Sequence, residues 1–290
     1  SPAPEAAASE VSVTRRAAFD PLRLAFPPRL GHPGGESAFE GGRMKGPMAL
    51  TADLVARCER NEPDPGPEGG YRHYVDQDYE RAADQVLAAA PPGPLWVFAY
   101  GSLIWKPAIP TTDHARATAH GWHRAFCLQL TRYRGSPAQP GLMMGLKRGG
   151  SCKGMIHRVA DDERRALLIA LLRREIGCDE DMTGVRWINV ATEAGAERAL
   201  VFWAEPEGLQ DWVDKPMPEV AQILARACGH VGSCAAYLFH TVAKLDELGI
   251  RDRNLWRLQH MVADEIRRLH AIMPPIEEIG SAAAPEPFAR

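Results

Sequence analysis

The 290-residue sequence lacks the features of a membrane, secreted or nucleic-acid-binding protein. No run of about 18 apolar residues occurs and residues 1–30 hold no apolar signal-peptide stretch, so we expect neither a membrane span nor secretion. The six cysteines include no C-x-x-C pair and are too sparse for a disulfide-stapled domain, which indicates reduced thiols and a cytoplasmic protein. Lys and Arg number 34 against 37 Asp and Glu, so no basic excess favours nucleic-acid binding.

Apolar periodicity is weak in the N-terminal third of the chain. Two short segments there, 51–60 and 76–89, have helical spacing, and the breaker sequence NEPDPGPEGG separates them. The stretch before them is rich in Ala, Pro, Gly and Arg, a composition that cannot bury enough apolar surface to fold. The expected organisation is a flexible extension at 1–47, a helical appendage at 48–94, a main domain at 95–272 and a flexible tail at 273–290.

Beyond Gly93-Pro94 the pattern changes to short apolar runs interrupted by helices. Six segments have the length and composition of strands: 95–100, 124–131, 142–147, 153–160, 185–192 and 197–204. One helix is expected to begin at Asp161-Asp162, and three more are expected at 218–228, 233–248 and 253–270. Several strands lie close together with turn signals between them, which favours a mainly antiparallel sheet or barrel.

The most informative local feature is Tyr100-Gly101-Ser102-Leu103, which follows the first apolar run directly. A strand that runs into a Gly-Ser turn exposes consecutive backbone N–H groups, and such groups bind carboxylates or stabilise an oxyanion. On spacing alone, an ordinary turn is the commoner interpretation. Ser102 is a weak candidate for a hydrolase nucleophile, because the second glycine of the G-x-S-x-G elbow is missing.

Glu175 is expected on the apolar face of the first predicted helix. Leu168, Leu171 and Leu172 precede it by seven, four and three residues, which places all four side chains on one face. A carboxylate in this position either pairs with a cation such as the adjacent Arg174 or escapes to solvent at the helix end. If it faces a cavity instead, desolvation raises its pKa and makes it a usable general base or acid.

Other polar groups carry weaker signals. His114, His120 and His123 include an H-x2-H pair but have no matching ligands at metal-site spacing, so we expect no metal. The segment YRGSPAQPG at 133–141 is expected to be a stiff loop, either a substrate contact or a plain connection. In GHVGSCAAYL, Tyr237 falls early in a helix, where its hydroxyl either reaches a cavity or is satisfied in the core.

Taken in order, these segments resemble the ChaC-like γ-glutamylcyclotransferases. WVFAYGSLIWKP is similar to the family's opening strand and its Y-G-S-L signature. GWHRAFCL, the R-G-S-P-x-x-P-G loop and the Arg174-Glu175 pair follow in the family's order, and the resemblance extends over about residues 95–270. Ala99 departs from the family's Gly before the Tyr. In G-H-V-G-S-C-A-A-Y-L, His230 and Cys234 replace the family's Pro and Asn.

The resemblance implies an α+β fold with a small, mainly antiparallel six-stranded β-barrel and surrounding helices. It also implies cleavage of a γ-glutamyl amide, that of glutathione above all, to 5-oxoproline and cysteinylglycine without a metal or organic cofactor. Glu175 is then the expected general base and acid. The expected substrate contacts are Tyr100, Gly101, Ser102, Leu103, Tyr237 and, for the cysteinylglycine half, Arg134.

Two alternatives stay open on sequence evidence. The substrate can be another γ-glutamyl amine or dipeptide, as in neighbouring cyclotransferase branches. The protein can also be a non-enzymatic γ-glutamyl-binding or transport-regulating module, although a binding site has no need of a core-facing base such as Glu175. The small-molecule substrate is the only partner that the sequence indicates, with no nucleic acid and no membrane, and it specifies no oligomeric state.

Overall fold

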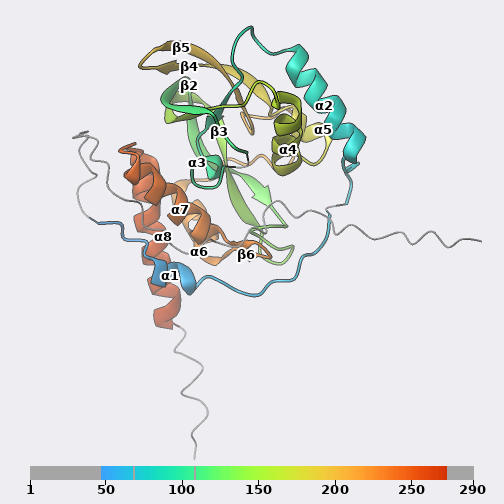
Figure 1. Ribbon diagram of the computed structural model, residues 1–290. Helices are drawn as coiled ribbons and strands as arrows, with labels where there is room; N and C mark the ends of the chain where they lie inside the picture. The colour runs from blue at the N-terminus through green and yellow to red at the C-terminus, as the bar shows by residue number, and fades with distance from the viewer. Residues whose placement is uncertain (1–46, 68, 108, 273–290) are drawn as a thin grey trace, which may run out of the picture.

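The computed structural model describes residues 47–67, 69–107 and 109–272, and its centre is a closed β-barrel flanked by helices (Figure 1). The strands are β1 (Trp96–Ala99), β2 (Asp113–Leu130), β3 (Gly141–Arg158), β4 (Arg186–Thr192) and β5 (Gly195–Val201). Around the barrel they run in the order β1-β3-β2-β4-β5. Every neighbouring pair is antiparallel except β1 and β5, which close the barrel in parallel. The predicted α+β barrel is confirmed, with five strands in the barrel instead of six.

The strand count differs because β3 is one continuous strand. The predicted strands 142–147 and 153–160 are its two halves, and pairing with β2 continues on both sides of Gly149 and Gly150, through Arg148 and Ser151. Gly149 and Gly150 have φ angles of 99° and 71°, which glycine adopts without strain, so β3 bends there and does not end. A register shift on the facing strand, between His120 and Trp122, accompanies the bend. In the sequence these glycines look like a turn, so the prediction divided β3 in two. The prediction for β2 was also too short, because β2 begins at Asp113 and not at residue 124.

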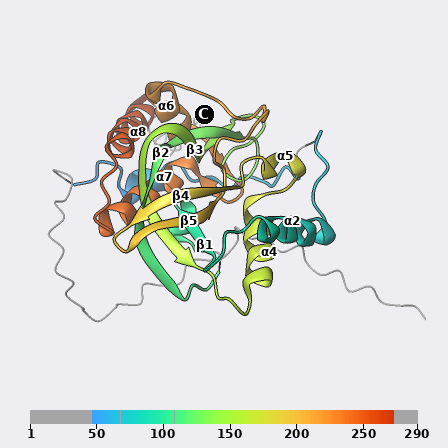
Figure 2. The ribbon, with the colours of Figure 1, turned by 90° about the horizontal axis from the view of Figure 1, so that it is seen from above.

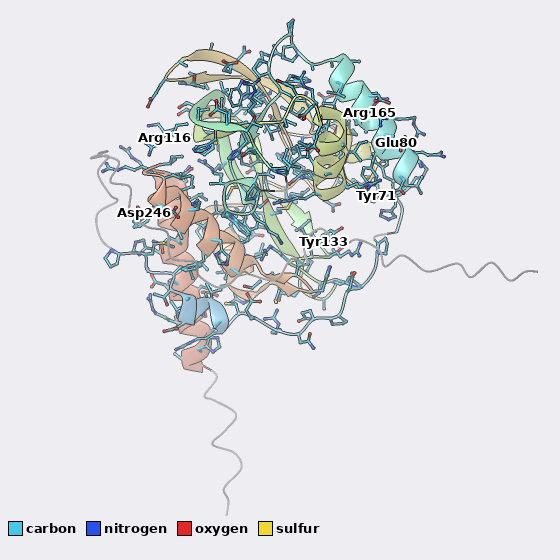
Figure 3. All side chains as sticks on the ribbon, in the orientation of Figure 1. Tyr71, Glu80, Arg116, Tyr133, Arg165 and Asp246 are labelled. Carbon is cyan, nitrogen blue, oxygen red and sulfur yellow. The ribbon has the colours of Figure 1, made fainter. Side chains whose placement is uncertain are left out.

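One flank of the barrel carries α2 (Asp76–Ala88), α4 (Arg164–Glu175) and the short α5 (Asp179–Met182). The apolar faces of α2 and α4 meet barrel residues such as Val97 and Leu200 in a shared core. Arg165 of α4 pairs with Asp84 of α2 at 2.7 Å and approaches Glu80 at 3.8 Å (Figure 3). Packing against both the barrel and α2 fixes the axis of α4, and with it the place where this helix ends.

The opposite flank is covered by a second helical layer (Figure 2). It contains α1 (Ala52–Ala56), α6 (Met217–Arg226), α7 (Cys234–Glu247) and α8 (Arg253–Ile272), together with the two-residue strands β6 (Cys228–Gly229) and β7 (Gly232–Ser233). The short α3 (Ser102–Trp105) connects this layer to the end of β1. Leu50 and Leu54 are buried in the same core as the barrel and α7, and Leu50 N–H donates to Gln259 Oε1 at 2.8 Å. The start of the segment predicted as an appendage therefore packs within the main core.

All six cysteines are free and buried. Within the described ranges, no helix has the length and apolar character needed to cross a bilayer. The predicted flexible extension at 1–47, apart from Pro47, and the predicted tail at 273–290 lie outside the described residues.

Candidate active site

A cavity opens where β1 runs into α3, beside the last turn of α4 and the first turns of α7. Its empty volume, counted out to the solvent, is about 320 Å³. The lining includes residues that the sequence singled out: Tyr100, Gly101, Ser102, Leu103, Glu175 and Tyr237. Met143, Met144, Phe202 and Trp203 complete it. Segments far apart in the sequence thus converge on one site.

The turn after β1 depends on the absence of a side chain at Gly101. A Cβ at this position would lie 2.7 Å from the Tyr237 hydroxyl oxygen, closer than a Cβ contact tolerates. The N–H of Ile104 donates to the Gly101 carbonyl at 3.0 Å and closes the turn into α3. Glycine is therefore required so that the Y-G-S-L backbone can approach α7.

Tyr237 is held on the cavity wall by the start of α7. Ser233 caps this helix, which places Tyr237 in the first turns with its hydroxyl toward Ser102. The Ser102 N–H donates to that hydroxyl at 3.2 Å, while the rings of Trp105 and Phe126 lie edge-on at 5.8 and 5.9 Å. Burial raises the pKa of Tyr237 to about 12, so the hydroxyl keeps its proton at neutral pH.

Tyr100 contributes a wall to the cavity and no available proton. Its hydroxyl donates to the Phe202 carbonyl at 2.9 Å, and burial raises its pKa well above the ordinary value. The hydrogen bond joins the end of β1 to the segment that follows β5. The hydroxyl of Tyr100 is thus already committed to the fold.

Glu175 is the last residue of α4, and it reaches the cavity as the helix-face argument predicted. Leu168, Leu171 and Leu172 are buried on the same helix, and the Glu175 side chain is 11% exposed. Burial raises its pKa, and the Arg174 guanidinium, with Nε 3.2 Å from Oε1, opposes that rise. The result is a carboxyl group that takes up a proton more readily than a surface carboxylate does.

Two neighbours hold the Glu175 end of the cavity. Arg174 donates to Ser102 Oγ at 3.1 Å and to the Lys106 carbonyl, so the cation beside the carboxylate is tied to α3. The indole N–H of Trp203 also lowers the pKa of Glu175. In the geometry of this structure, however, Trp203 Nε1 and Glu175 Oε1 are both buried without a full hydrogen bond. A buried donor and a buried acceptor on one cavity are groups that a ligand can satisfy.

Trp203 lines the cavity although no motif in the sequence singles it out. It falls within the predicted strand 197–204, but β5 ends at Val201. Trp203 has a φ of 56°, and its carbonyl accepts from the Leu146 N–H at 2.8 Å, so the chain leaves the strand and turns its indole to the cavity. A non-glycine residue with positive φ gives no signal in a strand pattern.

Arg134 is not among the residues that line the cavity, and its contact with the cysteinylglycine half stays a prediction. Its guanidinium lies 5.4 Å from the centre of the Tyr237 ring, and Nη1 donates to the Ser233 carbonyl at 2.8 Å. Burial lowers the pKa of Arg134. Arg134 therefore acts on the site through Tyr237, which it supports from behind.

The histidines give no new reason to assign a metal. His123 Nδ1 lies 3.0 Å from the Gly149 carbonyl oxygen, a contact of the β2–β3 pair. Across the described residues, no group of three or more His, Cys, Asp or Glu side chains is arranged to hold a metal ion. Independence from metals and cofactors stays a prediction.

Comparison with known proteins assigns the family. The model of the ChaC-like protein family matches residues 95–265, more than half of the chain. The chain belongs to this family. One curated relative of the ChaC-like protein is the glutathione-specific gamma-glutamylcyclotransferase of Escherichia coli, 36% identical over 187 residues that cover 61% of this chain and 77% of the relative. The mouse glutathione-specific gamma-glutamylcyclotransferase 1 is 35% identical over 150 residues, 51% of this chain and 67% of the relative.

A more distant relative and a solved structure extend the comparison. The Arabidopsis thaliana gamma-glutamylcyclotransferase 2-3 is 27% identical over 175 residues, 58% of this chain and 88% of the relative. The crystal structure of the yeast gamma-glutamyl cyclotransferase specific to glutathione superposes with a TM-score of 0.54 at 21% identity, covering 61% of this chain and 99% of the yeast chain. The ChaC-like protein shares the fold of that structure.

Proposed function

We propose that this ChaC-like protein cleaves the γ-glutamyl amide of glutathione by intramolecular cyclisation, giving 5-oxoproline and cysteinylglycine. The observation that carries the proposal is the convergence of Glu175, a buried carboxyl with a raised pKa, and the Gly101-Ser102-Leu103 turn on one cavity. The names of the E. coli and mouse relatives support glutathione as the substrate. The protein supplies a base, hydrogen-bond donors and a shaped pocket, which are the groups that this reaction needs.

The nucleophile in this reaction is the α-amino group of the substrate itself. It is protonated at neutral pH, so Glu175 accepts one proton before or as the nitrogen attacks the γ-carbonyl carbon. The C–N bond to the ring forms, and negative charge develops on the γ-oxygen. When the amide bond to cysteine breaks, protonated Glu175 gives its proton to the departing amine and becomes a carboxylate again. The ring nitrogen still carries one proton in excess, which the regenerated carboxylate takes up and passes to the same amine, so that cysteinylglycine leaves as an ammonium ion. Atoms and charge balance without water as a reactant.

Hydrogen-bond donors of the turn stabilise the developing charge in this proposal. Gly101, Ser102 and Leu103 line the cavity, and the Tyr237 hydroxyl lies beside the Ser102 N–H. Because this hydroxyl accepts from the Ser102 N–H, its own proton is directed elsewhere and can be donated to a substrate oxygen. A raised pKa keeps that proton in place. Tyr237 thus serves as a neutral donor beside the reacting carbonyl.

A substrate panel tests the proposal. The protein is incubated with glutathione, γ-Glu-Cys and γ-Glu-Ala while 5-oxoproline is quantified. We expect release from glutathione at the highest kcat/KM. Preference for γ-Glu-Ala would move the assignment to other γ-glutamyl compounds, and no release from any of the three would refute a cyclotransferase. A cytoplasmic location belongs to the same proposal, and the six free cysteines support it.

A further inference from the structure

Arg124 is a buried charge that the proposed mechanism does not use. It lies on β2, and its side chain is 2% exposed. Its Nε donates to the Tyr100 carbonyl at 2.6 Å, one Nη donates to Asp252 Oδ2 at 3.0 Å, and the other donates to the Lys153 carbonyl. A buried guanidinium is costly, and here all three nitrogens have acceptors. The first of these acceptors is the residue that opens the Y-G-S-L turn.

The bond to the Tyr100 carbonyl fixes the peptide that joins Tyr100 to Gly101. This peptide is trans, because the described residues contain no cis peptide bond. In a planar trans peptide, the C=O and the N–H point in opposite directions. The Tyr100 carbonyl faces Arg124, so the Gly101 N–H points away from Arg124, and Gly101 lines the cavity. The charge on Arg124 also polarises the carbonyl and strengthens its N–H as a donor.

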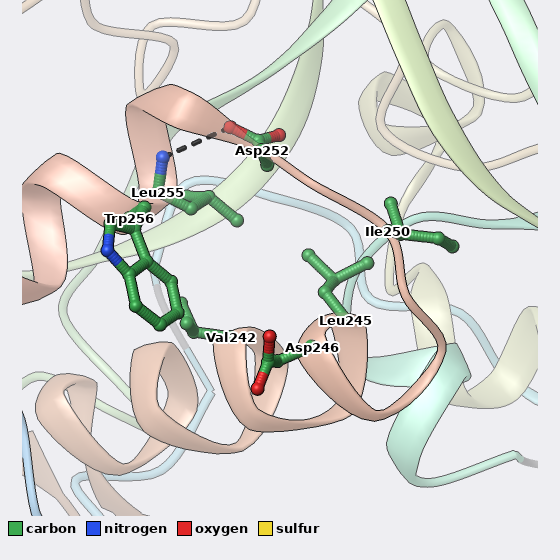
Figure 4. Close-up of a pocket in the computed structure, with 7 residues that line it drawn as sticks. All are labelled: Val242, Leu245, Asp246, Ile250, Asp252, Leu255 and Trp256. Carbon is green, nitrogen blue, oxygen red and sulfur yellow. Dashed lines mark hydrogen bonds between the residues drawn. The ribbon is translucent and has the colours of Figure 1, made fainter. Parts of the chain in front are cut away.

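Asp252 holds the far end of this arrangement. Its Oδ1 accepts from the N–H groups of Asn254 and Leu255 at 3.1 Å at the start of α8, while Oδ2 accepts from Arg124. Asp252 also lines a second, smaller cavity beside α7, where its bond to Leu255 is visible (Figure 4). A helix start thus fixes Asp252, Asp252 fixes Arg124, and Arg124 fixes the turn.

We propose that Arg124 is a positioning residue for the cyclisation, held by Asp252, that orients and polarises the Tyr100–Gly101 peptide so that the Gly101 N–H meets the charge developing on the γ-oxygen. This inference rests on the proposed function. Arg124 does not line the cavity, yet it acts on the transition state. The negative charge on the γ-oxygen develops only in that state and is absent from the bound substrate. Loss of Arg124 therefore lowers kcat more than it weakens substrate binding.

The variant Arg124→Lys keeps the charge but cannot reach three acceptors. We expect kcat for glutathione to fall about tenfold or more while KM changes by less than about threefold, as for loss of an oxyanion donor. The isosteric variant Asp252→Asn should change kcat and KM in the same directions but by smaller factors. It tests the inference even if Arg124→Lys does not fold. Arg226→Lys is the matched control, because Arg226 also anchors α8, through Glu265, without touching the turn. It should keep the wild-type kcat.

A spectroscopic readout separates this inference from the proposed function. Tyr100-Gly101 is the one Tyr-Gly step in the sequence, so protein labelled with carbonyl-¹³C tyrosine and ¹⁵N glycine gives a single HNCO signal from this peptide. We expect the Gly101 amide proton to move upfield in Arg124→Lys and Asp252→Asn, and to stay in place in Arg226→Lys. An unmoved signal in the first two variants, or a wild-type kcat in both, would overturn the inference. If the wild type releases no 5-oxoproline, the proposed function fails and the signal still decides whether Arg124 controls the peptide.

Discussion

Glu175 differs from most glutamates at helix ends because of where α4 stops. Such a side chain is ordinarily solvated, since the last turn of a helix sits at a surface. Here α4 is packed on the barrel and on α2, and the chain leaves it at Ile176 in an extended conformation beneath the cavity. The carboxylate is desolvated as a consequence, and its pKa rises. The Arg174 guanidinium beside it opposes this rise in the pKa.

Replacing Glu175 by Gln removes the proton acceptor while preserving shape. We expect turnover to fall about a hundredfold or more. Because the pKa of Glu175 is raised, the folded protein binds this proton more tightly than the unfolded chain does. At a pH above the pKa that Glu175 has in the unfolded chain, its ionisation therefore lowers the free energy of unfolding. Tm at pH 8 should therefore be no lower in Glu175→Gln than in the wild type. The control is Glu163→Gln at the other end of the same helix, and wild-type 5-oxoproline production by Glu175→Gln would contradict the assignment.

Trp203 offers a prediction about pH. Its indole N–H lowers the pKa of Glu175, so Trp203→Phe removes a group that favours the ionised carboxylate. The acidic limb of the kcat/KM profile should then move to higher pH, because more alkali is needed to ionise Glu175. Trp187→Phe is the matched control, since Trp187 also carries a buried indole nitrogen without a partner but lies outside the cavity lining. An acidic limb that stays in place in Trp203→Phe would mean that another group sets it.

Single residues show which parts of the site could be predicted from sequence. Glu175 followed from helical spacing, and the Tyr100–Leu103 turn followed from a strand that ends in Gly-Ser. Both signals are local, so they survive without knowledge of the fold. Trp203 and Arg124 could not be found this way, because their roles depend on contacts with segments far away in the sequence. Local patterns identify the groups that carry chemistry, whereas the groups that orient them require the assembled barrel.

At the scale of elements, the loop between β2 and β3 packs on the start of α7 and does not line the cavity. The loop contains two prolines, and the fold turns Arg134 toward the Ser233 carbonyl and the Tyr237 ring. Gly229 packs so closely on this loop that a Cβ would lie 2.3 Å from the Tyr133 carbonyl oxygen. The loop is thus a support for the first turns of α7. The sequence could not reveal this, because β6 and β7 bring that segment of the chain beneath the loop.

Arg134→Ala should therefore impair all γ-glutamyl substrates alike. Tyr237 loses the cation behind its ring and α7 loses a hydrogen bond at its cap, so we expect kcat/KM for glutathione and for γ-Glu-Ala to fall by similar factors, about tenfold. Arg132→Ala on the same loop breaks the pair with Asp64 and the contact with the Tyr133 ring, and it should leave both values unchanged. A fall confined to glutathione would return Arg134 to the substrate contact that the sequence predicted.

At the scale of the whole molecule, the barrel serves as a frame between two helical layers (Figure 1). One layer supplies Glu175 from α4, the other supplies Tyr237 from α7, and the end of β1 supplies the turn between them. The strand and helix periods predicted the longer helices and a part of every barrel strand, but not the full lengths of β2 and β3. The closure of the barrel through a parallel β1–β5 pair is a long-range contact that no periodicity indicates. The site exists only once that closure has brought Phe202 and Trp203 against the turn.

Truncations test how the N-terminal segment takes part in the molecule. Deleting residues 1–46 removes none of the described contacts, so activity and Tm should stay close to those of the full chain. Deleting residues 1–60 also removes Leu50, Leu54, Val55 and Cys58 from the main core, and we expect it to abolish stable folding. Thermal melting and 5-oxoproline release measure both outcomes. A stable and active 61–290 chain would show that α1 is dispensable.

The most direct test of the central claim follows the atoms of glutathione. Substrate carrying ¹⁵N at the α-amino group of its glutamyl residue is incubated with the protein in H₂¹⁸O, and the products are analysed by mass spectrometry. Intramolecular cyclisation predicts 5-oxoproline that retains ¹⁵N in the ring and contains no ¹⁸O, released together with cysteinylglycine. Free glutamate that carries ¹⁸O would show that water is the nucleophile, and it would contradict the account.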